Sequence, residues 1–197
     1  MNIVRNDWWI TPVWEIQTDF DTQFNNNLLR ESNSSEHINI WNNDTPTINK
    51  LKEYTLQLVT ELAAPYISQN FKDFKFWHTN GWINYSVPGI HMPIHGHGGP
   101  KIVLTYYIKA PENSGDLLLI DPRNGCDWDN GNDGLNGTKF QRIKPAESKI
   151  VFFPGFLLHM VEPNKSDEVR VSLSTNMGTF DGDNVTKRLY DSLVENA

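Results

Sequence analysis

Three of the protein's six histidines lie in one short stretch, residues 91–100, where His95 and His97 flank a single glycine. Side chains two residues apart point to the same face of an extended strand, so these two imidazoles are predicted to lie side by side. Gly96 between them adds no side chain that would crowd a metal. A third histidine, His159, lies far downstream. A close pair with one remote partner can form a three-ligand metal face on a β-barrel, and imidazole suits iron, zinc, copper or nickel.

The other histidines fit such a site less well. His91 precedes His95 by four residues, which would place both on one face of a regular strand. Pro93 between them can break that alternation, and two residues four apart are too distant along a strand to share one metal easily. His91 is therefore predicted to line the pocket rather than to bind the metal, and His37 and His78 are expected to be solvated.

Composition disfavours several classes of protein. The chain has 197 residues, which is typical of a single domain over residues 1–197, and its net charge of −7 without a basic run argues against nucleic-acid binding. No apolar run approaches the ~20 residues needed to cross a bilayer, and the first residues lack the apolar core of a secretory signal. The only cysteine, Cys126, allows no disulfide within the chain and fits a reducing compartment. We therefore expect a cytoplasmic protein without membrane contact.

Helical periodicity is confined to the first part of the chain. The aromatic and β-branched residues 8–16 predict an opening strand, and residues 19–31 predict a short helix. An apolar stripe predicts a longer helix over residues 48–70, with Thr47 as its N-cap and Pro65 ending or kinking it. These N-terminal helices are expected to cover one sheet.

From residue 73 onward the pattern is one of short strands separated by turns. Residues 74–77 and 82–85 are expected to form two strands joined by a tight turn at Asn80-Gly81. Further strands are predicted in the histidine stretch and at residues 102–108, 116–120, 149–153, 157–161 and 169–174. Roughly seven or eight such strands predict an antiparallel sandwich or barrel of jelly-roll type. A long loop is expected over residues 124–140 and a terminal helix over residues 185–197.

An ordered set of motifs from about Trp82 to Asn176 resembles the iron(II)- and 2-oxoglutarate-dependent dioxygenases, above all a small bacterial and phage family of 2-oxoglutarate/iron oxygenases. The motifs are His95-Gly96-His97, Leu104-Thr105-Tyr106-Tyr107, the run from Gly115 to Arg123, the run from Phe153 to His159, and the run from Arg170 to Asn176. The resemblance implies a mainly β fold: a double-stranded β-helix (jelly roll) with N-terminal helices packed on one sheet. Its motif-bearing core would span about residues 73–178.

The resemblance also implies a site for Fe(II). His95 and His159 match the two histidine ligands of the superfamily, and His97 stands where most members have a carboxylate. An imidazole in place of that carboxylate leaves the iron one unit of charge more positive. Three-histidine iron sites exist in thiol dioxygenases, so His97 is predicted to be the third ligand, with Asp121 as an alternative carboxylate.

The implied co-substrate, 2-oxoglutarate, has a distal carboxylate that calls for an arginine fork. Arg170 lies eleven residues after His159, a spacing similar to that in prolyl hydroxylases. Ser172 shares the same face of the strand and can add a hydroxyl group. The alternative for Arg170 is a surface salt bridge with Glu168 or Asp167.

Three further residues match co-substrate contacts of related dioxygenases. Asn84 and Asn176 fall where alkylation-repair dioxygenases place polar contacts to 2-oxoglutarate, and Tyr107 matches a phenol that donates to its distal carboxylate. Tyr106 and Tyr107 point to opposite faces of a strand, so only Tyr107 is given this role. Packing in the protein interior is the alternative for all three.

The implied activity is hydroxylation, or a related oxidation, of a small-molecule or peptide substrate, with release of succinate and CO2. Two alternatives stay open. One is a cupin-like three-histidine dioxygenase that uses no 2-oxoacid, which His97 favours and Arg170 with Ser172 disfavours. The other is a non-catalytic metal-binding jelly roll whose histidines bind zinc or nothing. Exposed edges of the barrel would allow a homodimer.

Overall fold

The structure is a computed structural model that describes residues 11–32, 39–67, 75–123 and 140–180. Its helical segments are α1 (Thr22–Glu31), the 3₁₀ helix η1 (Ile40–Asn42) and α2 (Pro46–Ile67). Its strands are β1 (Trp14–Gln17), β2 (Lys75–Ser86), β3 (Met92–His95), β4 (Ile102–Lys109), β5 (Leu117–Ile120), β6 (Phe140–Ile143), β7 (Lys149–Pro154), β8 (His159–Val161) and β9 (Arg170–Phe180). None of the helices described is long and apolar enough to span a membrane.

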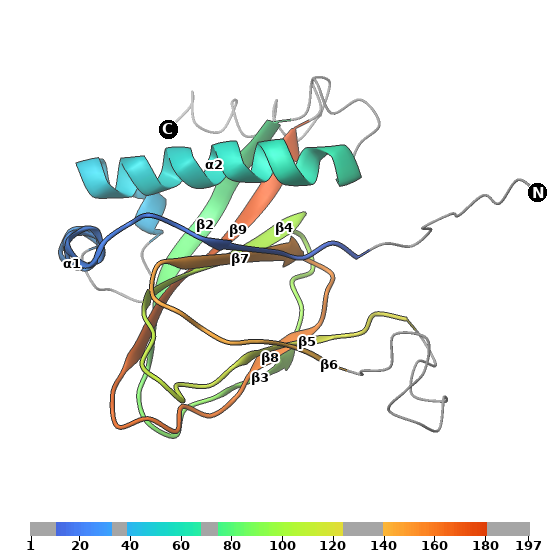
Figure 1. The fold of residues 1–197 in the computed structure, drawn as a ribbon. Coiled ribbons are helices and arrows are strands. Elements are labelled where there is room, and N and C mark those ends of the chain that lie inside the picture. Colours follow the sequence, from blue (N-terminus) through green and yellow to red (C-terminus); the bar gives the residue numbers. More distant parts are fainter. Residues whose placement is uncertain (1–10, 33–38, 68–74, 124–139, 181–197) are drawn as a thin grey trace, which may run out of the picture.

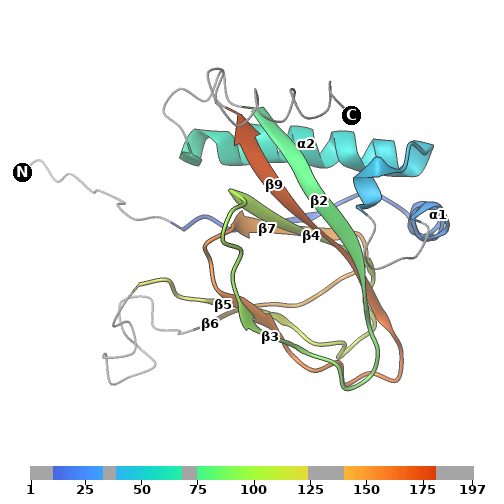
Figure 2. The ribbon, with the colours of Figure 1, turned by 180° about the vertical axis from the view of Figure 1, so that it is seen from behind.

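The strands form two antiparallel sheets that face each other (Figure 1, Figure 2). The five-stranded sheet has the order β1-β7-β4-β9-β2, and the four-stranded sheet has the order β3-β8-β5-β6. Between β2 and β9 the pairing is nested, because β2 pairs with β9, β3 with β8, β4 with β7 and β5 with β6. This nested pairing across two sheets is that of a jelly roll.

The helices cover the outer face of the five-stranded sheet, where α2 runs across β2 and β9 (Figure 1). Alternation along β4 divides the core into two layers. Leu104 and Tyr106 point toward the helices and join one buried apolar cluster, whereas Val103 and Tyr107 join a second cluster between the sheets. The predicted mainly β fold with N-terminal helices packed on one sheet is therefore confirmed.

Helix α2 begins and ends differently from the prediction. It begins at Pro46, before the predicted N-cap, because proline is well suited to the first turn of a helix. Thr47 instead donates its backbone N–H (2.9 Å) and its hydroxyl (2.7 Å) to the carboxylate of Glu31 at the end of α1. Pro65 lies inside the helix, which continues to Ile67. The predicted cap is therefore wrong, and Pro65 does not end the helix, which was one of its two predicted effects.

Strand β2 is continuous where two strands and a tight turn were predicted. Its register with β9 shifts between His78 and Asn80, which is a β-bulge, and the pairing then continues to Ser86. The indole ring of Trp41 packs against Gly81, and a Cβ atom at this position would collide with that ring. Asn80 therefore lies at the register shift and Gly81 makes a close contact with an aromatic ring. The predicted turn is wrong.

Most other elements lie near their predicted positions. Helix α1 falls inside the predicted range 19–31, and β9 continues six residues beyond the predicted end at Ser174, to Phe180. Strand β6 was not predicted, because it begins at the end of the glycine- and asparagine-rich stretch 124–140. His37, residues 8–10, the rest of that stretch and the predicted terminal helix lie outside the described residues.

His78 is buried, with 8% of its surface exposed, so the expectation that it is solvated is wrong. Its ring nitrogens lie 3.0 Å from the hydroxyl oxygens of Thr55 and Thr175, and its ring stacks on Trp41. Burial lowers the pKa of His78 to about 3, so the ring is neutral in the folded protein at neutral pH. The imidazole thereby links α2 to both β2 and β9.

Acidification is expected to destabilise the fold through His78. The pKa is about 3 in the folded protein and 6.5 for an ordinary histidine, so the stability contributed by the neutral ring is complete above pH 6.5 and is lost as pH falls below it. Chemical denaturation at pH 7 and pH 5 should show a loss from this residue of about 2 kcal/mol in the wild type. His78→Gln, which keeps a polar partner for the threonines, should remove that part of the pH dependence. Equal pH dependence in both proteins would contradict this account.

Candidate metal centre and adjoining cavity

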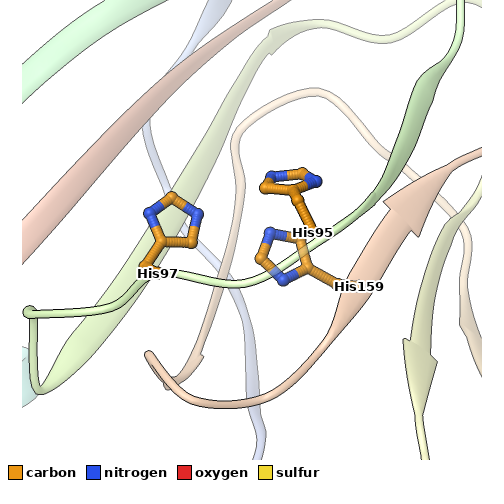
Figure 3. Close-up of side chains that lie close together, drawn as sticks. All are labelled: His95, His97 and His159. Carbon is orange, nitrogen blue, oxygen red and sulfur yellow. The ribbon is translucent and has the colours of Figure 1, made fainter.

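The three histidines predicted as metal ligands come together on one side of the four-stranded sheet (Figure 3). His95 at the end of β3 lies opposite His159 at the start of β8 in the antiparallel register. His97 follows β3, and its backbone N–H donates to the carbonyl of Gly155 (3.0 Å). The ligand atoms that the three rings offer all lie within 4.8 Å of one another. The cluster is the only such group of metal-ligating side chains among the described residues.

Backbone carbonyls fix the tautomers of two of these rings. Nδ1 of His95 lies 2.8 Å from the carbonyl oxygen of Pro93, and Nδ1 of His159 lies 2.9 Å from that of Leu157. Because a carbonyl oxygen can only accept a hydrogen bond, each Nδ1 must carry the proton. The lone pair of each neutral ring is then on Nε2, where it is available to a metal.

The surroundings of the cluster lower the pKa of two of its imidazoles. Burial lowers the pKa of His159 to about 4, and repulsion from the other two imidazoles contributes to that shift. The pKa of His97 is also lowered, first by burial and then by repulsion from His95. Neutral imidazoles at physiological pH are the form that binds metals, so this donor set fits a divalent transition metal.

The alternative ligands lie elsewhere. The carboxylate of Asp121 accepts hydrogen bonds from the backbone N–H (3.0 Å) and Nε (2.9 Å) of Arg123, and it is not part of the cluster. This pairing lowers the pKa of Asp121 and holds the carboxylate in a local turn. His91 is exposed and borders the cavity described next, as predicted.

A cavity of about 100 Å³ adjoins the three histidines. Much of its wall comes from alternate residues of the five-stranded sheet: Trp82, Asn84 and Ser86 of β2, Val103, Thr105 and Tyr107 of β4, and Arg170, Ser172 and Ser174 of β9. No carboxylate lies among the described residues that line the cavity. Its volume is well below the ~300–1,000 Å³ typical of sites for drug-sized ligands, so it suits a small molecule.

Arg170 is the one cation among the described lining residues. Its side chain is buried, and Nη1 donates to the carbonyls of Ser114 (2.7 Å) and Gly115 (2.9 Å), while Nη2 donates to the hydroxyl of Ser86 (2.9 Å). Nε has no hydrogen-bond partner in the described part of the chain. Of the five N–H donors of a guanidinium, Nε–H and one Nη2–H are therefore left over, and the Nε and Nη2 atoms lie along one edge of the group. Such an edge matches the two oxygens of a carboxylate.

The predicted alternative for Arg170, a surface salt bridge, does not form in the structure. Glu168 pairs instead with Lys109 at 2.6 Å, and the hydrogen-bond acceptors around Arg170 are all neutral. Burial lowers the pKa of Arg170 from its ordinary value, yet an arginine remains charged in proteins. The cavity therefore holds a positive charge that no described protein carboxylate neutralises.

Residues 80–176 match the model of a protein family described as "Putative 2OG-Fe(II) oxygenase". This segment, just under half of the chain, matches the 2OG-Fe(II) oxygenase family. The match indicates an enzyme of the oxidoreductase class, and the family description names Fe(II) and 2-oxoglutarate, as the sequence motifs predict. No curated protein sequence matches the chain.

Solved structures of low sequence identity share the fold. A Pseudomonas putida prolyl-4-hydroxylase is 14% identical with a TM-score of 0.56, over 83% of this chain and 85% of that chain. HygX from Streptomyces hygroscopicus, solved with nickel and 2-oxoglutarate bound, is 11% identical with a TM-score of 0.59, over 85% of this chain and 83% of that one. The chain spans 59% of a 2OG-Fe(II) oxygenase family oxidoreductase from Burkholderia pseudomallei, over 68% of its own length, at 12% identity and a TM-score of 0.47.

The residues predicted to contact the oxygenase co-substrate divide into two groups. Asn84, Tyr107, Arg170 and Ser172 all line the cavity. Asn84 already donates to the hydroxyl of Ser174 (2.9 Å) and accepts from the indole of Trp82 (3.0 Å). Asn176 is not among the described lining residues, and its amide lies beside His97 instead.

Tyr107 and its neighbour Tyr106 lie on different faces of the five-stranded sheet. Burial raises the pKa of Tyr107 to about 12, so its phenol is a protonated hydrogen-bond donor at neutral pH. Tyr106 points into the helical layer, where its hydroxyl donates to the side-chain oxygen of Asn25 (2.5 Å). Only Tyr107 of the pair faces the oxygenase cavity.

Several lining residues of the oxygenase cavity were not predicted. Ser86 holds Arg170, and Trp82 orients Asn84. Ser86 and Trp82 lie two residues on either side of Asn84, and Thr105 lies two residues before Tyr107, so strand alternation alone could have identified all three. The carbonyls of residues 114–115, which also hold Arg170, leave no mark in the sequence.

A divalent metal is expected to stabilise the protein through the three histidines. Co(II) at about 100 times its dissociation constant should raise the free energy of unfolding by about 2.7 kcal/mol, which is measurable as an increase in Tm. Alanine at position 95, 97 or 159 should weaken Co(II) binding by more than the ~10–100-fold typical of outer-shell changes. His91→Ala is the matched histidine control and should retain the full increase. Metal stabilisation that survives loss of any of the three would remove that residue from the ligand set.

Proposed function

We propose that the chain is an Fe(II)- and 2-oxoglutarate-dependent dioxygenase that hydroxylates a small-molecule or peptide substrate, with release of succinate and CO2. One observation carries the proposal. Three convergent imidazoles and a buried arginine with a free edge border the same small cavity, which no described carboxylate lines. Such a cavity is complementary to a metal ion and a small dianion together.

His95, His97 and His159 would hold Fe(II) through one ring nitrogen each. When bound, the iron and 2-oxoglutarate supply the oxidising power of the reaction from dioxygen. The protein's part is to orient the imidazoles, which the carbonyls of Pro93 and Leu157 do for His95 and His159, while burial keeps His159 neutral. Three ligands on one side leave the other side open to small ligands.

The distal carboxylate of 2-oxoglutarate would bind to the free edge of Arg170. Ser172 lies two residues further along β9 on the same face, and Tyr107 is opposite Ser172 in the register of β4 and β9. Both hydroxyl groups can donate to a carboxylate, and Asn84, opposite Ser172 on β2, adds an amide to the same wall. Charge-assisted bonds of this kind are worth about 1.5–3 kcal/mol each.

The substrate would approach from the opposite side of His97. An open groove of about 540 Å³ lies there, lined by His97, by Lys101, by exposed apolar side chains at 156 and 158, and by several glycines. His97 borders both this groove and the smaller cavity. A substrate in the groove would therefore lie next to the metal while 2-oxoglutarate occupies the cavity. A groove of this volume can hold a small molecule or part of a peptide.

We also propose that residues 1–197 form one domain and that the protein is cytoplasmic. The length of 197 residues supports one domain. A single cysteine, Cys126, supports a reducing compartment, because it cannot form a disulfide within the chain.

A three-histidine dioxygenase that uses no 2-oxoacid is the second candidate. His97 in the ligand set favours it, because a carboxylate is the usual third ligand of the co-substrate-dependent enzymes. Arg170 disfavours it, since a buried guanidinium with an unused edge has no purpose there without an anionic ligand. A requirement for 2-oxoglutarate separates the two candidates.

Anaerobic titration of the Fe(II) protein with 2-oxoglutarate tests the proposal. The chelate should produce a weak visible charge-transfer band that saturates with the co-substrate. Arg170→Met removes the fork and should weaken 2-oxoglutarate binding by about 10–100-fold, whereas Fe(II) affinity should be kept. Arg170→Lys, which keeps the charge without the fork, should give an intermediate loss.

The matched control is Arg142→Met. Arg142 is exposed and pairs with Glu162 and Asp116 away from the cavity, so its loss should leave the titration unchanged. Near-ultraviolet circular dichroism checks that the carbonyls released by Arg170 do not unfold the protein. No band with iron bound would reject the 2-oxoglutarate proposal and favour the second candidate.

A further inference from the structure

Asn176 lies beyond the end of the row of β9 side chains that line the cavity. That row ends at Ser174, and alternation along the strand puts Asn176 on the same face. Thr175 between them points the other way, where its hydroxyl accepts a hydrogen bond from the indole N–H of Trp41 (2.9 Å). The side chain of Asn176 is therefore directed toward the space between the sheets.

A chain of backbone hydrogen bonds brings His97 to this end of β9. The N–H of His97 donates to the carbonyl of Gly155 (3.0 Å), Gly155 donates to Lys101 (3.1 Å), and Lys101 donates to Met177 (2.9 Å). Met177 directly follows Asn176. In agreement with this placement, the side-chain amide of Asn176 lies beside the His97 ring.

His97 and Asn176 each lack a partner that comparable groups have. Nδ1 of His95 and of His159 is held by a backbone carbonyl, but in the described ranges no backbone carbonyl accepts a hydrogen bond from the ring of His97. The side-chain oxygen of Asn176 is buried and makes no hydrogen bond to any described residue. A buried acceptor without a donor costs free energy, so a donor is expected to face it in the metal-bound protein.

We propose that Asn176 is a positioning residue for His97: the ring N–H that does not face the metal donates to Oδ1 of Asn176. This bond would fix the tautomer and the orientation of His97, as the carbonyls of Pro93 and Leu157 do for the other two rings. The proposal rests on the three-histidine centre of the proposed function but not on 2-oxoglutarate. It gives Asn176 a role different from the co-substrate contact that the resemblance implies.

Co(II) affinity without 2-oxoglutarate tests this role. Asn176→Leu removes the acceptor at similar volume and should weaken Co(II) binding by about 10–100-fold. Asn176→Asp keeps an acceptor and should restore the affinity. Asn43→Leu is the matched control, because the amide nitrogen of Asn43 is also buried without a partner among the described residues but lies next to η1 in the helical layer.

A double-mutant cycle separates positioning from a general effect on the fold. If Asn176 acts through His97, then Asn176→Leu should cause no further loss of Co(II) affinity in a His97→Ala background. An equal loss in both backgrounds would mean that Asn176 acts independently of His97 and would overturn the proposal.

Paramagnetic ¹H NMR of the Co(II) protein gives a spectroscopic readout. Each metal-bound ring should contribute one exchangeable, strongly shifted N–H resonance, and the His97→Ala variant identifies the one from His97. Asn176→Leu should broaden or remove that resonance alone, since its proton would exchange with solvent. If all resonances and the affinity are unchanged in Asn176→Leu, this inference fails and the proposed function stands. If the wild type binds no metal, both fail.

Discussion

A buried positive charge that no carboxylate of the described residues neutralises is the constraint on which the site depends. Removing a guanidinium from water costs several kcal/mol unless its donors are satisfied. Ser86 and the carbonyls of Ser114 and Gly115 satisfy part of Arg170, and these acceptors hold the side chain on one side only. The unsatisfied edge is stable only in a fold that can present it to an anion. The carboxylate-free lining of the cavity is consistent with that requirement.

Strand β9 meets this constraint by dividing its side chains between two layers. Residues 170, 172 and 174 face the cavity, whereas Leu173, Thr175 and Met177 are buried on the helical side. The hydroxyl of Thr175 joins Trp41 and His78, so the helical layer holds the same strand that carries Arg170. The polar network around His78 therefore supports the position of the cavity wall, although it contains no group that faces the cavity.

The sequence predicted those features of the site that depend on local spacing. His95 and His97 share a face because they lie two residues apart, and the same rule separates Tyr107 from Tyr106. The errors arose where distant residues decide the local structure. The ring of Trp41 packs against Gly81, and Trp41 together with α2 encloses His78. Neither contact can be recognised from the sequence around Gly81 or His78. The backbone acceptors of Arg170 could not be predicted from the sequence either, because they depend on how the turn before β5 packs against β9.

With His97 in place of the usual carboxylate ligand, the net charge of the metal ion and its protein ligands would be higher in the proposed complex. A divalent ion on three neutral imidazoles keeps its full charge of two, whereas a carboxylate ligand would reduce it to one. The attraction between that ion and a bound dianion is therefore larger than it would be with a carboxylate ligand. At contact distance and an effective dielectric constant near 20, the difference is about 4 kcal/mol per unit charge. Part of the co-substrate's binding energy would then come from the metal rather than from Arg170. His97 and Arg170, which lie on separate segments, would thus be coupled through the two ends of one small ligand.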